Sequence, residues 1–208
     1  MRETKRFQNL AELNISLILI STSGPLGRYI DLPVPVTIAF RALLGGILIY
    51  LFCRWKGFDF KVKKKDRGQI LTGGLLMLMH WLTYFYALKL SNVSIGMLSL
   101  FTFPVITALL EPVLLKTKFQ LIHLILGGLV IVGIYFLVPE FDINNNYTKA
   151  LGFGVFSAVC YALRNIIMKS KVSEYNGSVL MLYQLIIISA VLFPSFFILD
   201  TSNIAEEI

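Results

Sequence analysis

The stretch FTFPVITALLEP (residues 101–112) places one carboxylate and two prolines inside a long apolar segment. Pro104, Thr107 and Glu111 are spaced by three and four residues, which puts them on one face of a helix. Pro104 and Pro112 have no backbone N–H, so each leaves a carbonyl four residues earlier without its usual helical partner. This polar face predicts either a carboxylate that binds a solute or a proton, or a structural ion pair.

Arg164 is the natural partner for such an ion pair. It lies five residues before Lys169, just as Glu111 lies five residues before Lys116, and each lysine closes an apolar run. The two charges are therefore expected at similar depth, and we predict a salt bridge between Glu111 and Arg164. Loss of one partner would strand the other at a cost of roughly 3–5 kcal/mol.

Arg41 is another charge inside an apolar segment, on a helical face with Thr37 and Gly45. A charge at membrane depth costs roughly 2.5–3.5 kcal/mol on insertion scales, so such residues usually face the bundle interior. Arg41 could bind an anionic group of a solute. It could equally reach the membrane interface or hold a backbone carbonyl.

An aromatic and polar face occurs in segment 69–88, where His80, Thr83 and Tyr84 align and Trp81 lies alongside. This face suits the wall of a cavity for a partly apolar solute, although His80 could also be a hydrogen-bonded packing residue. The candidate solute-binding residues are His80, Trp81, Tyr84, Thr107, Glu111, Arg41, Tyr161, Arg164 and Gln184.

Segment 150–168 carries a polar stripe on one helical face, formed by Ser157, Cys160, Tyr161 and Arg164. Gly154, Ala158 and Ala162 are spaced four residues apart in the same segment. Small residues at this spacing permit close contact between membrane helices, and we expect packing there.

The elements that must position these residues follow from composition. Of the 208 residues, 56% are apolar and 15% are charged, against about 25% charged in a soluble domain. The mean hydropathy is +0.74. So few charges cannot cover the surface of a soluble protein, so we predict an all-α polytopic membrane protein.

Seven apolar runs are close to the roughly 20 residues that cross the hydrocarbon core. The first also resembles a secretory signal, because basic residues precede it, but no clear cleavage pattern follows and we favour a span. The seven predicted transmembrane helices are 13–30, 34–53, 69–88, 93–115, 120–138, 150–168 and 179–199.

The positive charges set the expected orientation. With the N-terminus cytoplasmic, fourteen lysines and arginines fall in inner segments and three in outer ones, which follows the positive-inside rule. We therefore expect a multi-pass protein of the plasma (inner) membrane with a cytoplasmic N-terminus. Seven spans would place the C-terminus outside.

Two polar segments divide the chain. Residues 54–68, RWKGFDFKVKKKDRG, are expected to form a solvated cytoplasmic linker that fixes topology, with attraction of anionic lipid as the alternative. Residues 139–148 form a polar outer loop. The predicted units are residues 1–138, with five helices, and residues 139–208, with two.

The second unit repeats the sequence pattern that opens the first. NISLILISTSGPLGRYI leads into VTIAFRALLGGILIYL, and later ALGFGVFSAVCYALRNII leads into SVLMLYQLIIISAVLF. Five spans separate the two starts, so the second unit would insert upside-down. Inverted repeats of this kind are typical of transporters.

YALKLSNVSIGMLSLFTFPVITALLEPVLL (86–115), FRALLGG and the ALRN…YQL pattern resemble the EamA family of the drug/metabolite transporter superfamily. The resemblance runs over most of residues 14–199. It implies two inverted five-span repeats, alternating access and transport of small organic metabolites, such as amino-acid-like or drug-like solutes, with ion or proton coupling. Glu111 and His80 are the plausible titrating groups.

Two features depart from the family pattern. LKTKFQ (115–120) has Thr117 where the family often carries a glutamate, so no role of that glutamate transfers here. The second repeat is also truncated after helix seven. The alternative expectation is therefore a non-transporting fragment, or a half that needs the missing C-terminal helices or a dimer partner.

Enzymatic chemistry finds little support in the sequence. The two histidines, His80 and His123, fall in different apolar runs, and no pair of His or Cys has metal-ligand spacing. No phosphate-binding loop or nucleophile elbow occurs. We expect no enzyme activity, cofactor or metal.

The positive charges cluster between apolar runs rather than on one face, so we also expect no nucleic acid among the partners. The expected partners are a small-molecule solute and the lipid bilayer.

Overall fold

The computed structural model describes residues 2–116, 121–137, 142 and 145–199. This part of the chain is helical, and a single 3₁₀ turn, Lys64–Asp66, precedes one of the helices. The α-helices are α1 (Arg2–Ser21), α2 (Ser23–Tyr29), α3 (Val34–Trp55), α4 (Arg67–Leu90), α5 (Val93–Leu100), α6 (Phe103–Leu115), α7 (Ile122–Leu137), α8 (Asn146–Val172), α9 (Gly177–Leu192) and α10 (Ser195–Ile198).

Six candidate membrane spans occur in the described residues, which confirms the helical membrane class. The predicted count of seven is not confirmed. The fifth predicted span, 120–138, corresponds to α7, which has 16 residues. At 1.5 Å per residue its described part is about 24 Å long. Residues 120 and 138 lie outside the described part of the chain.

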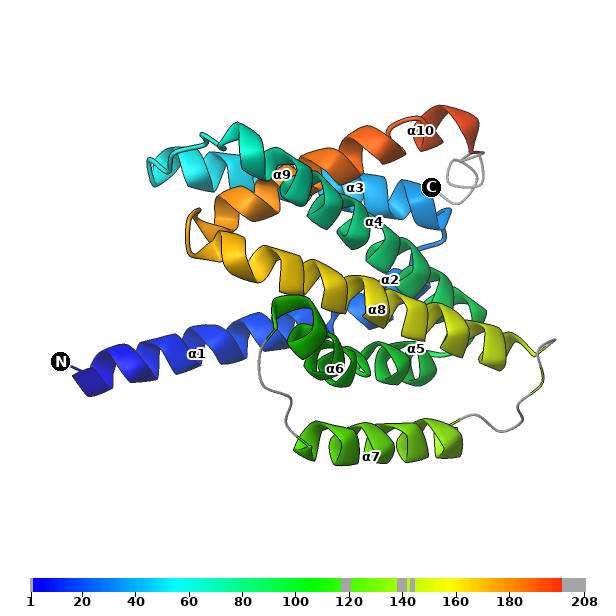
Figure 1. Ribbon diagram of the computed structural model, residues 1–208. Coiled ribbons are helices and arrows are strands. Elements are labelled where there is room, and N and C mark those ends of the chain that lie inside the picture. Colours follow the sequence, from blue (N-terminus) through cyan, green and yellow to red (C-terminus); the bar gives the residue numbers. More distant parts are fainter. Residues whose placement is uncertain (1, 117–120, 138–141, 143–144, 200–208) are drawn as a thin grey trace.

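The centre of the bundle is the pair α4 and α8. Figure 1 shows α3 and α9 on one side of this pair, α5 and α6 on the other, and α7 beyond α6. Glycines allow the close approach. A Cβ on Gly73 would lie 2.8 Å from Met168 of α8, and a Cβ on Gly74 would lie 2.6 Å from Ile187 of α9.

The stripe of small residues in α8 packs as predicted. Gly154, Ala158 and Ala162 are buried. A Cβ on Gly154 would collide with the Ser99 side chain of α5, so the two helices meet backbone to side chain at this point.

The predicted span 93–115 is divided into two helices just before Pro104. α5 ends at Leu100, and α6 begins at Phe103 with Pro104 in its first turn, where a missing N–H costs nothing. Pro112 lies inside α6. The expected break is therefore confirmed at the first proline.

The first predicted span, 13–30, corresponds to the candidate span Leu10–Tyr29, which is formed by the end of α1 and by α2. α1 extends away from the bundle in Figure 1, and α2 packs on α4. A Cβ on Gly27 would lie 2.5 Å from the Phe85 ring. Arg28 Nη1 donates to the carbonyl of Leu88 at 2.9 Å and also to that of Ser91. These bonds hold α2 at the end of the bundle where α4 finishes.

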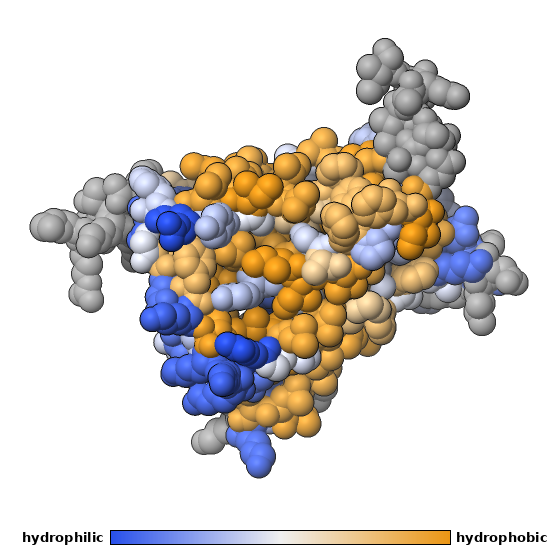
Figure 2. Space-filling model, turned by 90° about the horizontal axis from the view of Figure 1, so that it is seen from above, coloured by the Kyte–Doolittle hydropathy of each residue, from blue (hydrophilic) through white to orange (hydrophobic). Residues whose placement is uncertain are grey.

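The opposite end of the bundle, called here the basic end, holds the segment 54–68 and the last turn of α8. Figure 2 shows hydrophilic side chains gathered at the left edge of the molecule and hydrophobic side chains over most of the middle. A wide apolar belt with polar ends fits a bilayer environment.

A buried ion pair at the basic end was missed by the sequence analysis. Lys171 Nζ donates to Asp66 Oδ1 at 2.7 Å, with the two side chains 9% and 4% exposed. Tyr175 Oη donates to Asp66 Oδ2 at 2.6 Å. The expectation of a solvated linker is therefore wrong at Asp66, since it anchors segment 54–68 to the turn after α8.

A second, exposed pair lies beside it. Lys63 Nζ donates to Glu174 Oε2 at 2.8 Å. This hydrogen bond and the charge of Lys63 hold the pKa of the Glu174 carboxyl below its ordinary value, and Glu174 in turn raises the pKa of Lys63. The hydrogen bond to Asp66 raises the pKa of Tyr175.

Candidate functional site

The middle of the bundle contains a reciprocal polar contact between α4 and α8. Ser157 Oγ donates to the His80 carbonyl oxygen at 2.9 Å, and the same Oγ lies 2.7 Å from His80 Nδ1. Because the hydroxyl proton is already used, this geometry favours the neutral tautomer with its proton on Nδ1. His80 Nε2 has no hydrogen-bond partner among the described residues.

Aromatic rings surround this contact. The His80 ring stacks on Tyr161 of α8, with centroids 4.6 Å apart and planes at 28°, and lies 6.2 Å from the Tyr84 ring. Phe103 of α6 meets Tyr161 edge-on at 4.9 Å. His80 and Tyr84 are buried, while Tyr161 is partly exposed. Three spans thus contribute rings to one cluster.

Arg41 of α3 lies against the aromatic face of α4. Its Cζ is 4.9 Å from the Trp81 ring centroid and 5.5 Å from that of Phe85. At these distances the cation is attracted by the negative ring faces. Arg41 remains exposed, and it forms no hydrogen bond or salt bridge with the described residues.

Arg164 does not pair with Glu111, so the predicted salt bridge is wrong. Arg164 Nε donates to Gln184 Oε1 of α9 at 2.8 Å, and its Nη1 donates to Asn165 Oδ1 at 2.9 Å. Gln184 is fully buried and donates its own Nε2 to the Leu180 carbonyl at 3.1 Å. The arginine therefore turns toward α9, away from α6.

Glu111 takes a different cation. Its Oε1 accepts from Lys169 Nζ at 2.5 Å, and the side chains are 26% and 61% exposed. The pair joins α6 to the last turns of α8 near the basic end. The ion-pair alternative for Glu111 is thus the one seen, with a lysine one turn further along α8 than predicted.

The predicted site residues fall into a central cluster and two outlying pairs. His80, Trp81, Tyr84, Arg41 and Tyr161 adjoin one another, and Arg164 with Gln184 lies beyond Tyr161 on the side of the basic end. Thr107 and Glu111 stand apart on α6. The Thr107 hydroxyl donates to the Phe103 carbonyl of its own helix at 2.7 Å, and Glu111 is held by Lys169.

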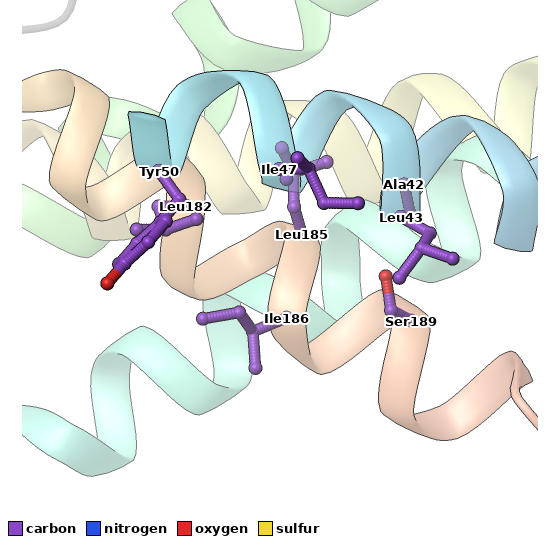
Figure 3. A pocket seen from close by; sticks show the side chains of 9 residues that line it. Ala42, Leu43, Ile47, Tyr50, Leu182, Leu185, Ile186 and Ser189 are labelled. Carbon is purple, nitrogen blue, oxygen red and sulfur yellow. The ribbon is translucent and has the colours of Figure 1, made fainter. Parts of the chain in front are cut away.

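A separate groove of about 350 Å³ runs between α3 and α9 (Figure 3). Its lining is apolar apart from two hydroxyl groups and contains none of the predicted site residues. The lining residues are Ala42, Leu43, Gly46, Ile47, Tyr50, Leu182, Leu185, Ile186 and Ser189. The groove offers a charged or polar solute far fewer polar and charged groups than the cluster around His80 does.

A model of the EamA-like transporter family matches residues 13–138, which include α2 to α7 and the second half of α1. The chain belongs to the EamA-like transporter family. This family is part of the drug/metabolite transporter superfamily and is a family of transporters. Comparison with curated proteins and with solved structures gives no match.

The family assignment and the six apolar helices identify a multi-pass membrane protein. The matched residues include the half of the central cluster that α3 and α4 supply. These residues are Arg41, His80, Trp81 and Tyr84. The other half, on α8 and α9, lies beyond the matched residues.

Sequence reasoning did not select three neighbours of the cluster. Ser157 was assigned to the polar stripe of its segment and not to the site, although its spacing from Tyr161 and Arg164 placed it on their face. Phe85 and Phe103 carried no signal, because an apolar ring in an apolar helix is indistinguishable from lipid-facing sequence.

Proposed function

We propose that this EamA protein transports small organic metabolites across the plasma (inner) membrane by alternating access, and that it is not an enzyme. The observation that carries the proposal is the polar and aromatic cluster between α4 and α8 in the middle of an apolar bundle. Polar groups at this depth are costly and usually mark a solute pathway. The aromatic rings add contact area for a partly apolar solute.

The expected movement separates the two halves of the cluster. His80, Trp81 and Tyr84 belong to the proposed first repeat, and Tyr161, Arg164 and Gln184 to the proposed second. Rocking of one repeat against the other would open the cluster alternately to each side. The bonds between His80 and Ser157 would then form and break in each cycle.

Proton or ion coupling completes the proposal. His80 Nε2 has no hydrogen-bond partner among the described residues, and Glu111 is a partly exposed carboxylate near the basic end, so these two groups are the proposed proton acceptors. The basic end, with its lysines, is proposed to face the cytoplasm together with the N-terminus.

The test is counterflow with the purified full chain in proteoliposomes. Vesicles loaded with a mixture of metabolites, anionic, neutral and cationic, are diluted into isotopically labelled mixture, and exchange is read by mass spectrometry against protein-free vesicles. We expect protein-dependent exchange of at least one solute. Absence of exchange for every solute, with protein of native elution profile, would contradict the transport function.

Proton coupling is tested with substitutions of the two proposed proton acceptors. A double substitution, His80→Gln with Glu111→Gln, is expected to flatten the pH dependence of exchange, because it removes both proposed proton acceptors. Glu12→Gln, an exposed glutamate on α1, serves as the matched control. An unchanged pH profile in the double variant would exclude coupling through these two groups.

A further inference from the structure

The charges within the packed spans are not balanced locally. Asp66 and Glu111, the carboxylates of the spans that pack into the bundle, each pair with a lysine near the basic end. Arg41 and Arg164 have no carboxylate within salt-bridge distance among the described residues. Within the part of the chain that the structure describes, these two positive charges in apolar helices have no carboxylate counter-ion.

Neighbouring groups use only part of the hydrogen-bonding capacity of Arg41 and Arg164. Arg164 uses two of the five guanidinium N–H groups that an arginine carries, both on neutral amide oxygens. Arg41 rests on aromatic rings and donates no hydrogen bond to the described residues. Arg41 is an exposed side chain, and Arg164 Nη2, which has no hydrogen-bond partner among the described residues, is not buried, so both arginines keep N–H groups that a ligand can reach.

The two arginines lie at different depths on either side of His80. Arg41 is seven residues from the start of α3, about 10 Å along the helix, and Arg164 is eight residues from the end of α8, about 12 Å along it. Hydrogen bonds from Arg28 and Lys89 place the start of α3 at the end of the bundle where α4 finishes. The end of α8 lies at the basic end.

His80 lies between Arg41 and Arg164 along the bundle. Tyr84 and Trp81, on the Arg41 side of His80, and Tyr161, on the Arg164 side, line the interval with rings. The interval between the cations is therefore lined by rings and hydroxyl groups, and no carboxylate of the described residues forms a salt bridge there.

We infer that the solute is an organic anion, a carboxylate with an aromatic or apolar body, and that Arg41 and Arg164 bind its anionic group from opposite halves of the membrane. This inference rests on the proposed transport function. A guanidinium binds a carboxylate through two parallel hydrogen bonds, which the accessible N–H groups can supply. A cationic solute would be repelled by both arginines and find no unpaired carboxylate in the cluster.

The test compares three probes that share a phenylalanine body. At pH 6.0, N-acetylphenylalanine is anionic, N-acetylphenylalaninamide is neutral and phenylalaninamide is cationic. Binding to the purified full chain in detergent is measured by isothermal titration calorimetry, and exchange is measured in proteoliposomes. We expect the anion to bind about tenfold or more tightly than the neutral amide, because charge-assisted bonds are the strong ones.

Variants locate the effect. Arg41→Gln and Arg164→Gln are each expected to weaken anion binding by roughly tenfold, while binding of the neutral amide is unchanged and reports that the variant is folded. Arg41→Lys and Arg164→Lys should restore part of the affinity. Arg54→Gln, an exposed arginine at the end of α3, is the matched control and should leave anion binding intact.

Each other outcome overturns the inference. Equal or tighter binding of the neutral or cationic probe, or loss of anion binding in Arg54→Gln alone, contradicts an anion site at these arginines. Binding of none of the three contradicts it as well. If only neutral or cationic metabolites exchange in the mixture screen, the proposed transport function is supported and the anionic solute is contradicted. If no solute exchanges, both proposals are contradicted.

Discussion

Charged side chains in the protein divide into two groups by their partners. Lysines at the basic end meet carboxylates, as in the pairs of Lys171 with Asp66 and Lys63 with Glu174. The arginines deeper in the bundle meet rings and amides. A lysine carries its charge on a flexible stem that reaches a membrane surface, whereas the planar guanidinium stacks on aromatic faces, so each residue type suits its depth.

The pair of Lys63 and Glu174 predicts a dependence of stability on pH. Because the folded state lowers the pKa of Glu174, the pair stabilises the protein above the ordinary glutamate value of about 4.3. That contribution is lost as the pH falls through the lower, folded value. The melting temperature of the wild type should exceed that of Glu174→Gln at pH 7, and the difference should shrink toward zero in acid.

The control for this measurement is Asp59→Asn, which changes an exposed carboxylate of the same segment outside the ion pair. Its melting temperature should follow the wild type across the range. A difference between wild type and Glu174→Gln that grows as the pH falls would contradict the prediction.

Residue types were easier to predict than their partners. The sequence identified Glu111 and Arg164 as charges at membrane depth, and both are where their helices were expected to place them. Their pairing was wrong because depth along a helix says nothing of direction around it. Arg164 faces α9 and Glu111 faces Lys169, a difference of one helical turn and a rotation that the sequence spacing could not decide.

α5 and α8 approach each other closely where Gly154 meets Ser99. The Gly–Ala–Ala spacing in α8 predicted tight packing, and the burial of all three residues confirms it. The sequence did not indicate that the partner would be α5. Nor did it place the end of α5 at Leu100, since the proline signal fixes only where the next helix can begin.

The contact of α5 with α8 gives a prediction at the scale of the helix pair. Gly154→Ala should destabilise the folded protein by about 1–3 kcal/mol, because the added methyl group overpacks a tight contact. Thermal unfolding in detergent measures this. Adding Ser99→Gly, which removes the opposing side chain, should recover much of the loss.

Gly152 offers a matched control on the same helix, because a Cβ there would meet nothing within 4 Å. Gly152→Ala should be neutral or slightly stabilising, since alanine favours a helix over glycine by about 0.5–1 kcal/mol. If the two alanine variants melt alike, the close contact at Gly154 does not limit stability.

For the whole molecule, composition sufficed to predict a helical membrane protein, because only a bilayer can accommodate so few charges. The span count was less secure. The described residues of the fifth predicted span, 120–138, form α7, which packs on one side of the bundle, and the count of seven stays a prediction. The inverted repeat stays a prediction.

The orientation is testable with single cysteines. The native Cys53 and Cys160 are buried, so a membrane-impermeant maleimide should leave the wild type unlabelled in intact cells. Tyr29→Cys, at an exposed site beside the end of α4, should be labelled in intact cells, and Lys64→Cys, at the basic end, only after permeabilisation. The reverse pattern would place the basic end outside.

The contact between His80 and Ser157 also constrains how the protein is made. The two residues are 77 positions apart, which at 5–20 residues per second corresponds to about 4–15 s of synthesis. During that time α4 has already emerged and its imidazole has no partner from α8. Until α8 arrives, the helix at the centre of the finished bundle depends on water, lipid headgroups or the insertion machinery to keep this polar group out of bare hydrocarbon. The order of synthesis therefore constrains the same two side chains that we propose to separate during transport.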